Sequence, residues 1–361
     1  MTLTRRERVQ RFLQSASTLC NPGYSEFDEV RAELTHTTGL SRQNVDWAFD
    51  CAFEVHPSMW DLEALCRRTP ECERAHVLLS ANVFVGALRA IAIAIAAAPE
   101  VHVRPSRREP QMVQWLAQVA PGDFEIENEL RPMPGDHVWA YGSDPTMREL
   151  RKELPAGTTI HEHGHGYGIV VLFESDLRFA PSLGTIAEAI AADTAPFDQR
   201  GCLSPRIVLI EAGHSSAQEF SIALAAALAE RERVIPFGFL SEDERADIVR
   251  YRDALIVAGA VLRAGSGFVT FESEKLPWLL PPAGRILHVK AAANAILEAR
   301  AKSPELTTIG VFRPESENTL SLSRAFPSAR IAAIGSMQRP MLDGPVDLRC
   351  STSVPSLQFG T

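Results

Sequence analysis

The chain of 361 residues is long enough to bury a large hydrophobic core and to divide into two or three domains. Hydrophobic residues make up 45% and charged residues 22%, as in an ordinary globular protein. The formal net charge of −9 argues against nucleic acid as a partner. The six cysteines have no regular spacing, which argues against a disulfide framework or a zinc ribbon and favours a reducing, cytoplasmic location.

Two segments that could direct the chain to a membrane lack the features this would need. The basic N-terminal stretch MTLTRRERVQRFLQS has neither the apolar core nor the small-residue cleavage site of a secretory signal. The most apolar stretch, Val83–Ala98, is too short to span a bilayer and contains Arg89. We therefore expect a buried helix there and no membrane span.

Residues 1–75 predict a cap of short helices, because proline and glycine interrupt the helical pattern repeatedly. After it, His76–Ser80, Val83–Ala98 and Val101–Arg104 form a strand–helix–strand unit, which requires a parallel sheet with helices on its faces. The predicted fold class is therefore α/β. The alternation continues in the helices Gln111–Val119, Pro145–Leu154, Leu183–Ala192 and Ser216–Arg231 and in the strands His137–Tyr141, Thr158–His161, Ile169–Phe173, Ile207–Ile210, Phe268–Phe271, Arg285–Val289, Thr307–Phe312 and Arg330–Ile334.

Two turns that follow strands carry side chains suited to a ligand, because ligands of open α/β sheets gather beyond the carboxyl ends of the strands. Asn82 follows the first strand, although helix capping is the commoner role of an asparagine at such a position. Arg104, Arg107 and Arg108 surround the turn after the second strand. Their guanidinium groups suit a phosphate, whereas arginines in a loop commonly form only a solvated surface.

A third turn, formed by Gly142 and Ser143, precedes a helix that begins near Pro145. Free backbone N–H groups and the helix dipole favour a phosphate at such a helix N-terminus. A capped turn without a ligand explains the same residues. The usual G-x-G-x-x-G fingerprint of dinucleotide-binding folds is absent.

The polar segment TTIHEHGHGYGIVV is expected to be a loop between two strands and contains His161, His163 and His165 at alternate positions. Histidine is a common zinc ligand, but four suitable ligands are not evident, so no metal is expected. Glu162, among glycines, is a better candidate for an active-site base. In the next segment, FDQRGCLSPR, Cys202 could be a buried filler or a nucleophile held at a turn.

Taken in order, these segments resemble the aldehyde dehydrogenase superfamily, and most closely the luminescence-type (LuxC) long-chain fatty acyl-CoA reductase family. VRPS stands where aldehyde dehydrogenases have V-K-P-S followed by glutamate, YGSDP resembles the Gly-Ser turn under the cofactor pyrophosphate, and HEHGHG takes the place of L-E-L-G-G. DQRGCLSPR resembles the segment of the catalytic cysteine, and the tail ENTLSLSRAFPSARIAAIGSMQRPMLDGP resembles the C-terminal region of the reductases.

The resemblance implies a catalytic set and a cofactor. Cys202 is then the nucleophile, Asn82 holds the oxyanion, and Glu162 or a neighbouring histidine moves protons; the other cysteines are structural. The residues implied for cofactor binding are Arg104, Ser106, Arg107, Gly142, Ser143 and Gly164. Arg107 replaces the glutamate that would bind a ribose 2′-hydroxyl, and a cation there favours NADPH over NADH.

The resemblance also implies a domain organisation. A helical N-terminal cap (1–75) precedes a parallel-sheet, NADP-binding α/β domain (76–195) and an α/β catalytic domain with the cysteine (196–315). The C-terminal segment (316–361) returns to the nucleotide domain or forms an oligomer interface. The N-terminal region is shorter than in the reductases, and Glu272 is only a loose match for the second glutamate of aldehyde dehydrogenases, in E-x-F-G-P.

The implied activity is NADPH-dependent reduction of a long-chain acyl-CoA or other acyl thioester to the aldehyde through an acyl-cysteine. The donor would be acyl-CoA or an acyl carrier protein, and the chain would form a homo-oligomer or part of a multienzyme complex. Two alternatives stay open: an NAD(P)-dependent aldehyde or semialdehyde dehydrogenase, and a non-catalytic subunit that binds acyl groups or cofactor.

Overall fold

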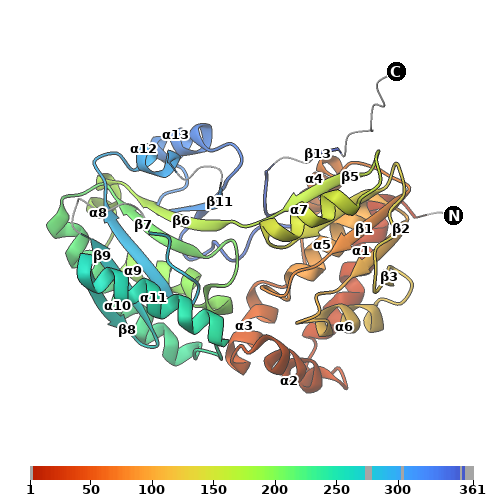
Figure 1. The fold of residues 1–361 in the computed structure, drawn as a ribbon, viewed down its shortest axis with the longest axis horizontal. Helices are drawn as coiled ribbons and strands as arrows, with labels where there is room; N and C mark the ends of the chain where they lie inside the picture. Colours follow the sequence, from red (N-terminus) through yellow and green to blue (C-terminus); the bar gives the residue numbers. More distant parts are fainter. Residues whose placement is uncertain (1–2, 273–278, 302–304, 350–351, 354–361) are drawn as a thin grey trace. The chain divides into compact units, whose positions relative to one another are not determined.

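The computed structural model describes residues 3–272, 279–301, 305–349 and 352–353, and the chain divides into two compact units (Figure 1). The first unit comprises Met1–Thr38, Ala48–His165 and Met341–Thr361, and the second comprises Gly39–Trp47 and Gly166–Pro340. No helix in the described part of the chain is both long enough and apolar enough to cross a membrane.

The N-terminal residues form short helices, as predicted: α1 (Arg5–Ala16), the 3-10 helix η1 (Ser17–Cys20), α2 (Phe27–Thr38), α3 (Arg42–Cys51) and α4 (Met59–Arg68). Local capping explains where two of them begin. Thr4 and Glu7 form a reciprocal capping box at α1, and Ser58 and Asp61 do the same at α4. The helical N-terminal segment is thus confirmed.

The first unit contains a six-stranded sheet in the order β13-β5-β4-β1-β2-β3, in which the five strands other than β13 run parallel. The strands are β1 (Arg74–Leu78), β2 (Glu100–Arg104), β3 (Glu125–Ile126), β4 (His137–Tyr141), β5 (Thr159–His163) and the antiparallel β13 (Thr352–Ser353). Three further helices complete this unit: α5 (Gly86–Ala97), α6 (Gln111–Val119) and α7 (Asp144–Glu153).

Two of these helices place the strands that matter for a site. Helix α5 is buried along nearly its whole length and packs on β1 and β2, which explains the apolar stretch in the sequence. Met147 of α7 belongs to a core cluster with Val138, Ala140 and Ile160 of β4 and β5. Because side chains alternate along a strand, α7 covers the face of β5 that also carries Glu162.

The second unit contains a seven-stranded sheet in the order β12-β11-β6-β7-β10-β9-β8. The strands are β6 (Tyr167–Leu172), β7 (Pro205–Ile210), β8 (Gly259–Ala264), β9 (Gly267–Glu272), β10 (Ile286–Ala291), β11 (Leu306–Val311) and β12 (Arg330–Ala333), and only β8 pairs antiparallel. The helical elements are α8 (Glu174–Phe179), α9 (Leu183–Thr194), η2 (Pro196–Gln199), α10 (His214–Val234), α11 (Glu242–Ala258), α12 (Ala295–Arg300) and α13 (Glu317–Ala325).

Both faces of the central strands β6 and β7 are buried, as their near-continuous apolar sequences predict. Val170 and Val208 belong to a core cluster with residues of α9 and α10. Their neighbours Ile169 and Ile207 belong to another cluster with residues of α12 and α13. The predicted α/β fold built on parallel sheets is confirmed.

Several details differ from the expectations. Each helix and strand named from the sequence is present within a few residues, but β5 extends to His163, so Glu162 lies in a strand and not in a loop. A division was expected after residue 195, but the compact units divide between residues 165 and 166. The reason is that β6 pairs with β7 and β11, which are strands of the second unit. The C-terminal segment is divided between the units after Pro340. Which unit binds a cofactor stays a prediction.

Candidate active site

Most of the implied site residues in the first unit follow the carboxyl ends of four neighbouring parallel strands. Asn82 follows β1, Arg104 ends β2, Gly142 follows β4 and Gly164 follows β5. These strands are adjacent in the order β5-β4-β1-β2. Parallel neighbours end at the same edge of a sheet, which is where open α/β folds bind their ligands.

Asn82 is not a helix cap. Helix α5 begins at Gly86 with Val85 as its N-cap residue, and no side chain caps it. A tight turn supplies the first backbone hydrogen bonds instead, from Gly86 N to Val83 O and from Leu88 N to Val85 O. The capping interpretation was therefore wrong, and Asn82 lies exposed in the loop between β1 and the helix.

The turn after β2 carries positive charge. Ser106 Oγ accepts a hydrogen bond from Arg108 N at 3.2 Å and so shapes the turn. Arg104 is half-buried and Arg107 exposed, and neither guanidinium forms an ion pair with another residue that the structure describes. Two such guanidinium groups at this edge of the sheet fit the phosphate of a nucleotide.

The turns after β4 and β5 are tied together at the N-terminus of α7. Ser143 is the N-cap residue and its hydroxyl accepts a hydrogen bond from Thr146 N at 3.4 Å. Asp144 Oδ1 accepts a hydrogen bond from His165 N at 3.0 Å, and a Cβ atom at Gly164 would lie only 2.7 Å from that oxygen. The close approach explains the glycine. The Asp144 carboxylate also makes this helix terminus less favourable for a pyrophosphate than the sequence indicated.

Glu162 is paired with an arginine that the sequence reading missed. Arg151, on α7, donates from Nε and Nη2 to the two carboxylate oxygens of Glu162. The glutamate side chain is 15% exposed and that of the arginine 53%. The order of elements predicts that the helix after β4 packs on β5, and so that one of its side chains could contact Glu162. The sequence pattern does not indicate which side chain this is.

The three histidines have different surroundings and do not gather around one point. His161 stacks on Trp139 with 4.3 Å between ring centroids, and His163 stacks on Tyr141 at 4.4 Å. Burial lowers the pKa of His161 to about 3 and that of His163 to about 4. His165 is exposed. The first two are therefore neutral, packed side chains, which makes them poor candidates for proton transfer.

One group of three candidate metal ligands lies close together among the described residues, and it does not involve these histidines. It consists of His102, Glu125 and Glu127, with ligand atoms within 4.8 Å of one another. His102 is also hydrogen-bonded to Glu100, so several carboxylates surround this ring at the sheet edge.

In the second unit, Cys202 lies in a turn between η2 and β7 and is half-buried. The turn is closed by a hydrogen bond from Ser204 N to Gly201 O at 3.1 Å. Elsewhere, burial raises the pKa of Cys20 and of Cys72 to about 11, which makes these thiols weak nucleophiles. Cys66 has a raised pKa for the same reason, Cys51 is exposed, and Cys350 lies outside the described residues.

Asn82 and Glu162 thus belong to the first unit and Cys202 to the second. Their combination in one catalytic centre is part of the proposal below.

The fold is that of the aldehyde dehydrogenases. Similar solved structures include an oxidoreductase from Marinobacter aquaeolei (12% identity, 97% of this chain and 80% of that chain, TM-score 0.70) and the aldehyde dehydrogenase KauB from Pseudomonas aeruginosa (15%, 92% and 76%, TM-score 0.67). A third is an NADP-dependent glyceraldehyde-3-phosphate dehydrogenase from Bacillus halodurans in complex with NADP (13%, 98% and 84%, TM-score 0.66). At these identities the likeness defines the fold.

The family follows from the sequence. Residues 121–348, more than half of the chain, match the acyl-CoA reductase (LuxC) family, and the chain belongs to that family. It is an oxidoreductase that forms aldehydes from acyl-CoA. The matched region includes Glu162 and Cys202, whereas Asn82 and Arg104 precede it. No curated protein sequence matches the chain significantly.

Proposed function

We propose that the protein reduces a long-chain acyl thioester to the aldehyde with NADPH, through an acyl group bound to Cys202. The observation that carries the proposal is the common edge of β1, β2, β4 and β5, beyond which Asn82, the arginine turn, the Gly-Ser turn and Gly164 all lie. A sheet edge so equipped suits a nucleotide and an oxyanion.

In the proposed route, the Cys202 thiolate attacks the acyl carbonyl and CoA leaves as its thiolate, so that one thioester replaces another. The Asn82 amide and a backbone N–H near Cys202 donate hydrogen bonds to the oxyanion. A nicotinamide cofactor, when bound, would supply the hydride that reduces the thioester to the thiohemiacetal. Cys202 then leaves as a thiolate when the resulting thiohemiacetal releases the aldehyde.

Several residues would hold the cofactor. Arg104 and Arg107 fit a ribose phosphate because their charges have no ion-pair partner among the described residues. Ser106, Gly142, Ser143 and Gly164 line the same edge of the sheet. This arrangement favours NADPH over NADH.

The oxidative alternative, an aldehyde dehydrogenase that hydrolyses its acyl-enzyme, needs a general base to activate water. Glu162 is the candidate, but both of its oxygens accept hydrogen bonds from Arg151. Hydrogen bonds from a guanidinium group to both oxygens hold the carboxylate against Arg151 and away from an attacking water molecule. The pair therefore favours the reductase, whose chemistry needs no attacking water. A non-catalytic subunit would not require both Cys202 and Asn82.

The test is NADPH oxidation with saturated acyl-CoA substrates of increasing chain length, compared with an acyl carrier protein carrying the same chains. We expect NADPH oxidation that depends on the thioester and equals aldehyde production. NADP reduction with an aldehyde, and no NADPH oxidation with any thioester, would instead support the oxidative alternative. Sedimentation of the active species tests the expected homo-oligomer.

A further inference from the structure

The residues immediately before Cys202 have an unusual backbone. Phe197, Asp198 and Gln199 have φ values of 55°, 49° and 65°, in the left-handed region. None of them is glycine, and left-handed conformations of other residues cost free energy. Three in succession persist only where the surrounding structure fixes them, which directs attention to what surrounds this turn.

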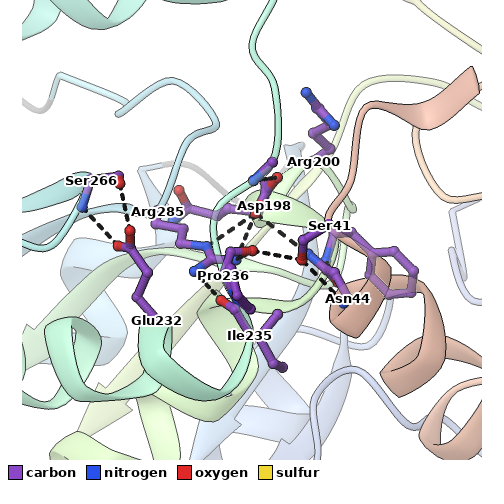
Figure 2. A network of polar contacts seen from close by, with 12 residues as sticks. Ser41, Asn44, Asp198, Arg200, Glu232, Ile235, Pro236, Ser266 and Arg285 are labelled. Atoms are coloured by element: carbon purple, nitrogen blue, oxygen red, sulfur yellow. Dashed lines mark hydrogen bonds and ion pairs between the residues drawn. The ribbon is translucent and has the colours of Figure 1, made fainter. Parts of the chain in front are cut away.

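Asp198 forms a fully buried ion pair with Arg285 (Figure 2). Its Oδ1 accepts hydrogen bonds from Arg285 Nε at 3.1 Å and from Nη2 at 2.7 Å. The side chains are 0% and 2% exposed. Arg285 also donates to Ile235 O at 2.7 Å and to Pro236 O at 3.2 Å, so each of its three guanidinium nitrogens donates a hydrogen bond inside the second unit.

Asn44 and Gly238 donate further hydrogen bonds to the Asp198 carboxylate. Asn44 Oδ1 accepts a hydrogen bond from Phe197 N at 2.9 Å, while its Nδ2 donates to Asp198 Oδ1 at 3.4 Å. Gly238 N donates to Asp198 Oδ2 at 3.0 Å. A Cβ atom at Gly238 would lie 2.8 Å from Asp198 Oδ2 and 2.2 Å from Gly39 O, so only glycine allows this approach.

Gln199 closes the base of the loop that carries Cys202. Its Nε2 donates to Pro205 O and to Ile286 O, both at 2.7 Å, and its Oε1 accepts from Ile286 N at 2.7 Å. The far side of the loop is held at Ser204, whose Oγ accepts from Gln338 Nε2 at 3.0 Å. Residues 200–204 are therefore fixed at both ends, with Cys202 in the middle.

We infer that Asn44, Asp198, Gln199 and Arg285, the turn-holding cluster, are positioning residues that set the location and exposure of the Cys202 thiol. Stability alone is a poor explanation for the cluster, because desolvating two charges costs free energy that hydrophobic residues of similar size would not require. The cluster instead fixes one conformation of the strained turn at residues 197–199, close in sequence to the Cys202 thiol. The inference rests on the proposed function, in which Cys202 is the nucleophile.

Three substitutions of Asp198 test the inference because they are expected to disturb the conformation of the turn to different extents. Asp198→Asn keeps a residue that tolerates the left-handed region and retains its hydrogen-bonding oxygen. Asp198→Gly and Asp198→Ala both remove the carboxylate and leave Arg285 unpaired, but only glycine adopts the left-handed conformation without strain. A difference between glycine and alanine therefore reports on the turn and not on the lost charge.

The first readout is alkylation of Cys202 by iodoacetamide as a function of pH, followed by peptide mass, with the exposed Cys51 of the first unit as an internal reference thiol. The second is the rate at which a long-chain acyl-CoA acylates the enzyme without NADPH. We expect acylation to fall on the order of 10²-fold in Asp198→Ala, less in Asp198→Gly and least in Asp198→Asn, since a displacement of about 1 Å can have such an effect. The pH profile at Cys202 shifts while that of Cys51 does not.

A matched control is Glu54→Gln, which removes the carboxylate from the largely buried pair of Glu54 with Arg89 in the first unit. It should lower stability and leave Cys202 alkylation unchanged.

If Asp198→Ala does not fold, Asn44→Ala and Gly238→Ala disturb the same turn without removing the charge of Asp198 or of Arg285, and we expect the same two readouts to change. Folded variants with wild-type alkylation and acylation of Cys202 would overturn the inference. Wild-type enzyme that is alkylated in the predicted pattern but never acylated would contradict the proposed function and leave the positioning role intact.

Discussion

Arg151 binds both carboxylate oxygens of Glu162, one through Nε and one through Nη2. The pair joins α7 to β5 at the residue that the family resemblance places in proton transfer. Both carboxylate oxygens are therefore engaged by the guanidinium group, which leaves the carboxylate poorly placed to contact a water molecule. The arrangement suits an enzyme that must reduce its acyl-cysteine before water hydrolyses it.

Glu162→Gln should therefore have little effect on reduction. We expect NADPH oxidation with acyl-CoA to fall by about threefold or less, because general-base assistance, which contributes about 10²-fold or more where it operates, is not required. Steady-state kinetics at saturating NADPH measure this. A loss of about 10²-fold would show that Glu162 takes part directly in the reductive chemistry.

Arg151→Met should release the Glu162 carboxylate and create an undesired activity. We expect hydrolysis of acyl-CoA in the absence of NADPH to rise by about tenfold or more, since Glu162 can then act as a general base. Release of free fatty acid measures the rate, and the double variant Arg151→Met/Glu162→Gln serves as the control that abolishes the gain. Unchanged hydrolysis in the single variant would contradict this role of the ion pair.

Arg107→Glu should change the cofactor preference. A carboxylate there repels a 2′-phosphate and can accept a hydrogen bond from a 2′-hydroxyl, so the ratio of kcat/KM for NADPH to that for NADH should fall by about tenfold or more. The neighbouring Arg108→Glu supplies the matched control, because Arg108 is also exposed and lies one residue further along the turn. Equal effects of the two substitutions would indicate general electrostatic attraction and not recognition of the phosphate.

His163 should make the first unit sensitive to acid. Burial lowers its pKa to about 4 from 6.5, and neither ring nitrogen has a hydrogen-bond partner among the described residues. Well above pH 6.5 both the folded and the unfolded chain hold the ring neutral. As the pH falls from 6.5 to 4 the unfolded chain takes up a proton that the folded chain resists, so the free energy of unfolding falls by up to about 3 kcal/mol.

Urea denaturation at pH 7.5 and pH 5 measures this effect. His163→Phe keeps the stacking on Tyr141 without a titrating group and should show a smaller loss of stability at pH 5 than the wild type. His165→Gln, at an exposed position of the same segment, should behave as the wild type. The same loss of stability in all three proteins would assign the acid sensitivity to other groups.

The sequence predicts the fold well because the strands that build the two sheets are short apolar runs separated by helices and turns. It also places Asn82, Arg104 and Gly142 at strand ends, since the order of elements alone determines which turns share an edge of a parallel sheet. The sequence pattern does not predict helix α11. Its apolar residues include the exposed Ile256 and Val257, so they do not form the single buried stripe by which an amphipathic helix is identified.

The partners of the site residues could not be predicted, because they come from distant parts of the chain. Arg285 lies 87 residues from Asp198, and Asn44 lies 154 residues from it. No periodicity or local motif indicates such a contact. The left-handed turn before Cys202 could not be predicted either, since the segment FDQ contains no glycine, the residue that usually indicates a positive φ.

The central claim, that Cys202 carries the acyl group, is tested most directly by the mass of the enzyme after reaction with a long-chain acyl-CoA in the absence of NADPH. The account predicts that the wild-type chain gains one acyl group, located on the peptide that contains Cys202, and loses it as aldehyde when NADPH is added. Cys202→Ala should gain no acyl group, although it remains folded. Acylation of Cys202→Ala at the wild-type rate would contradict the account.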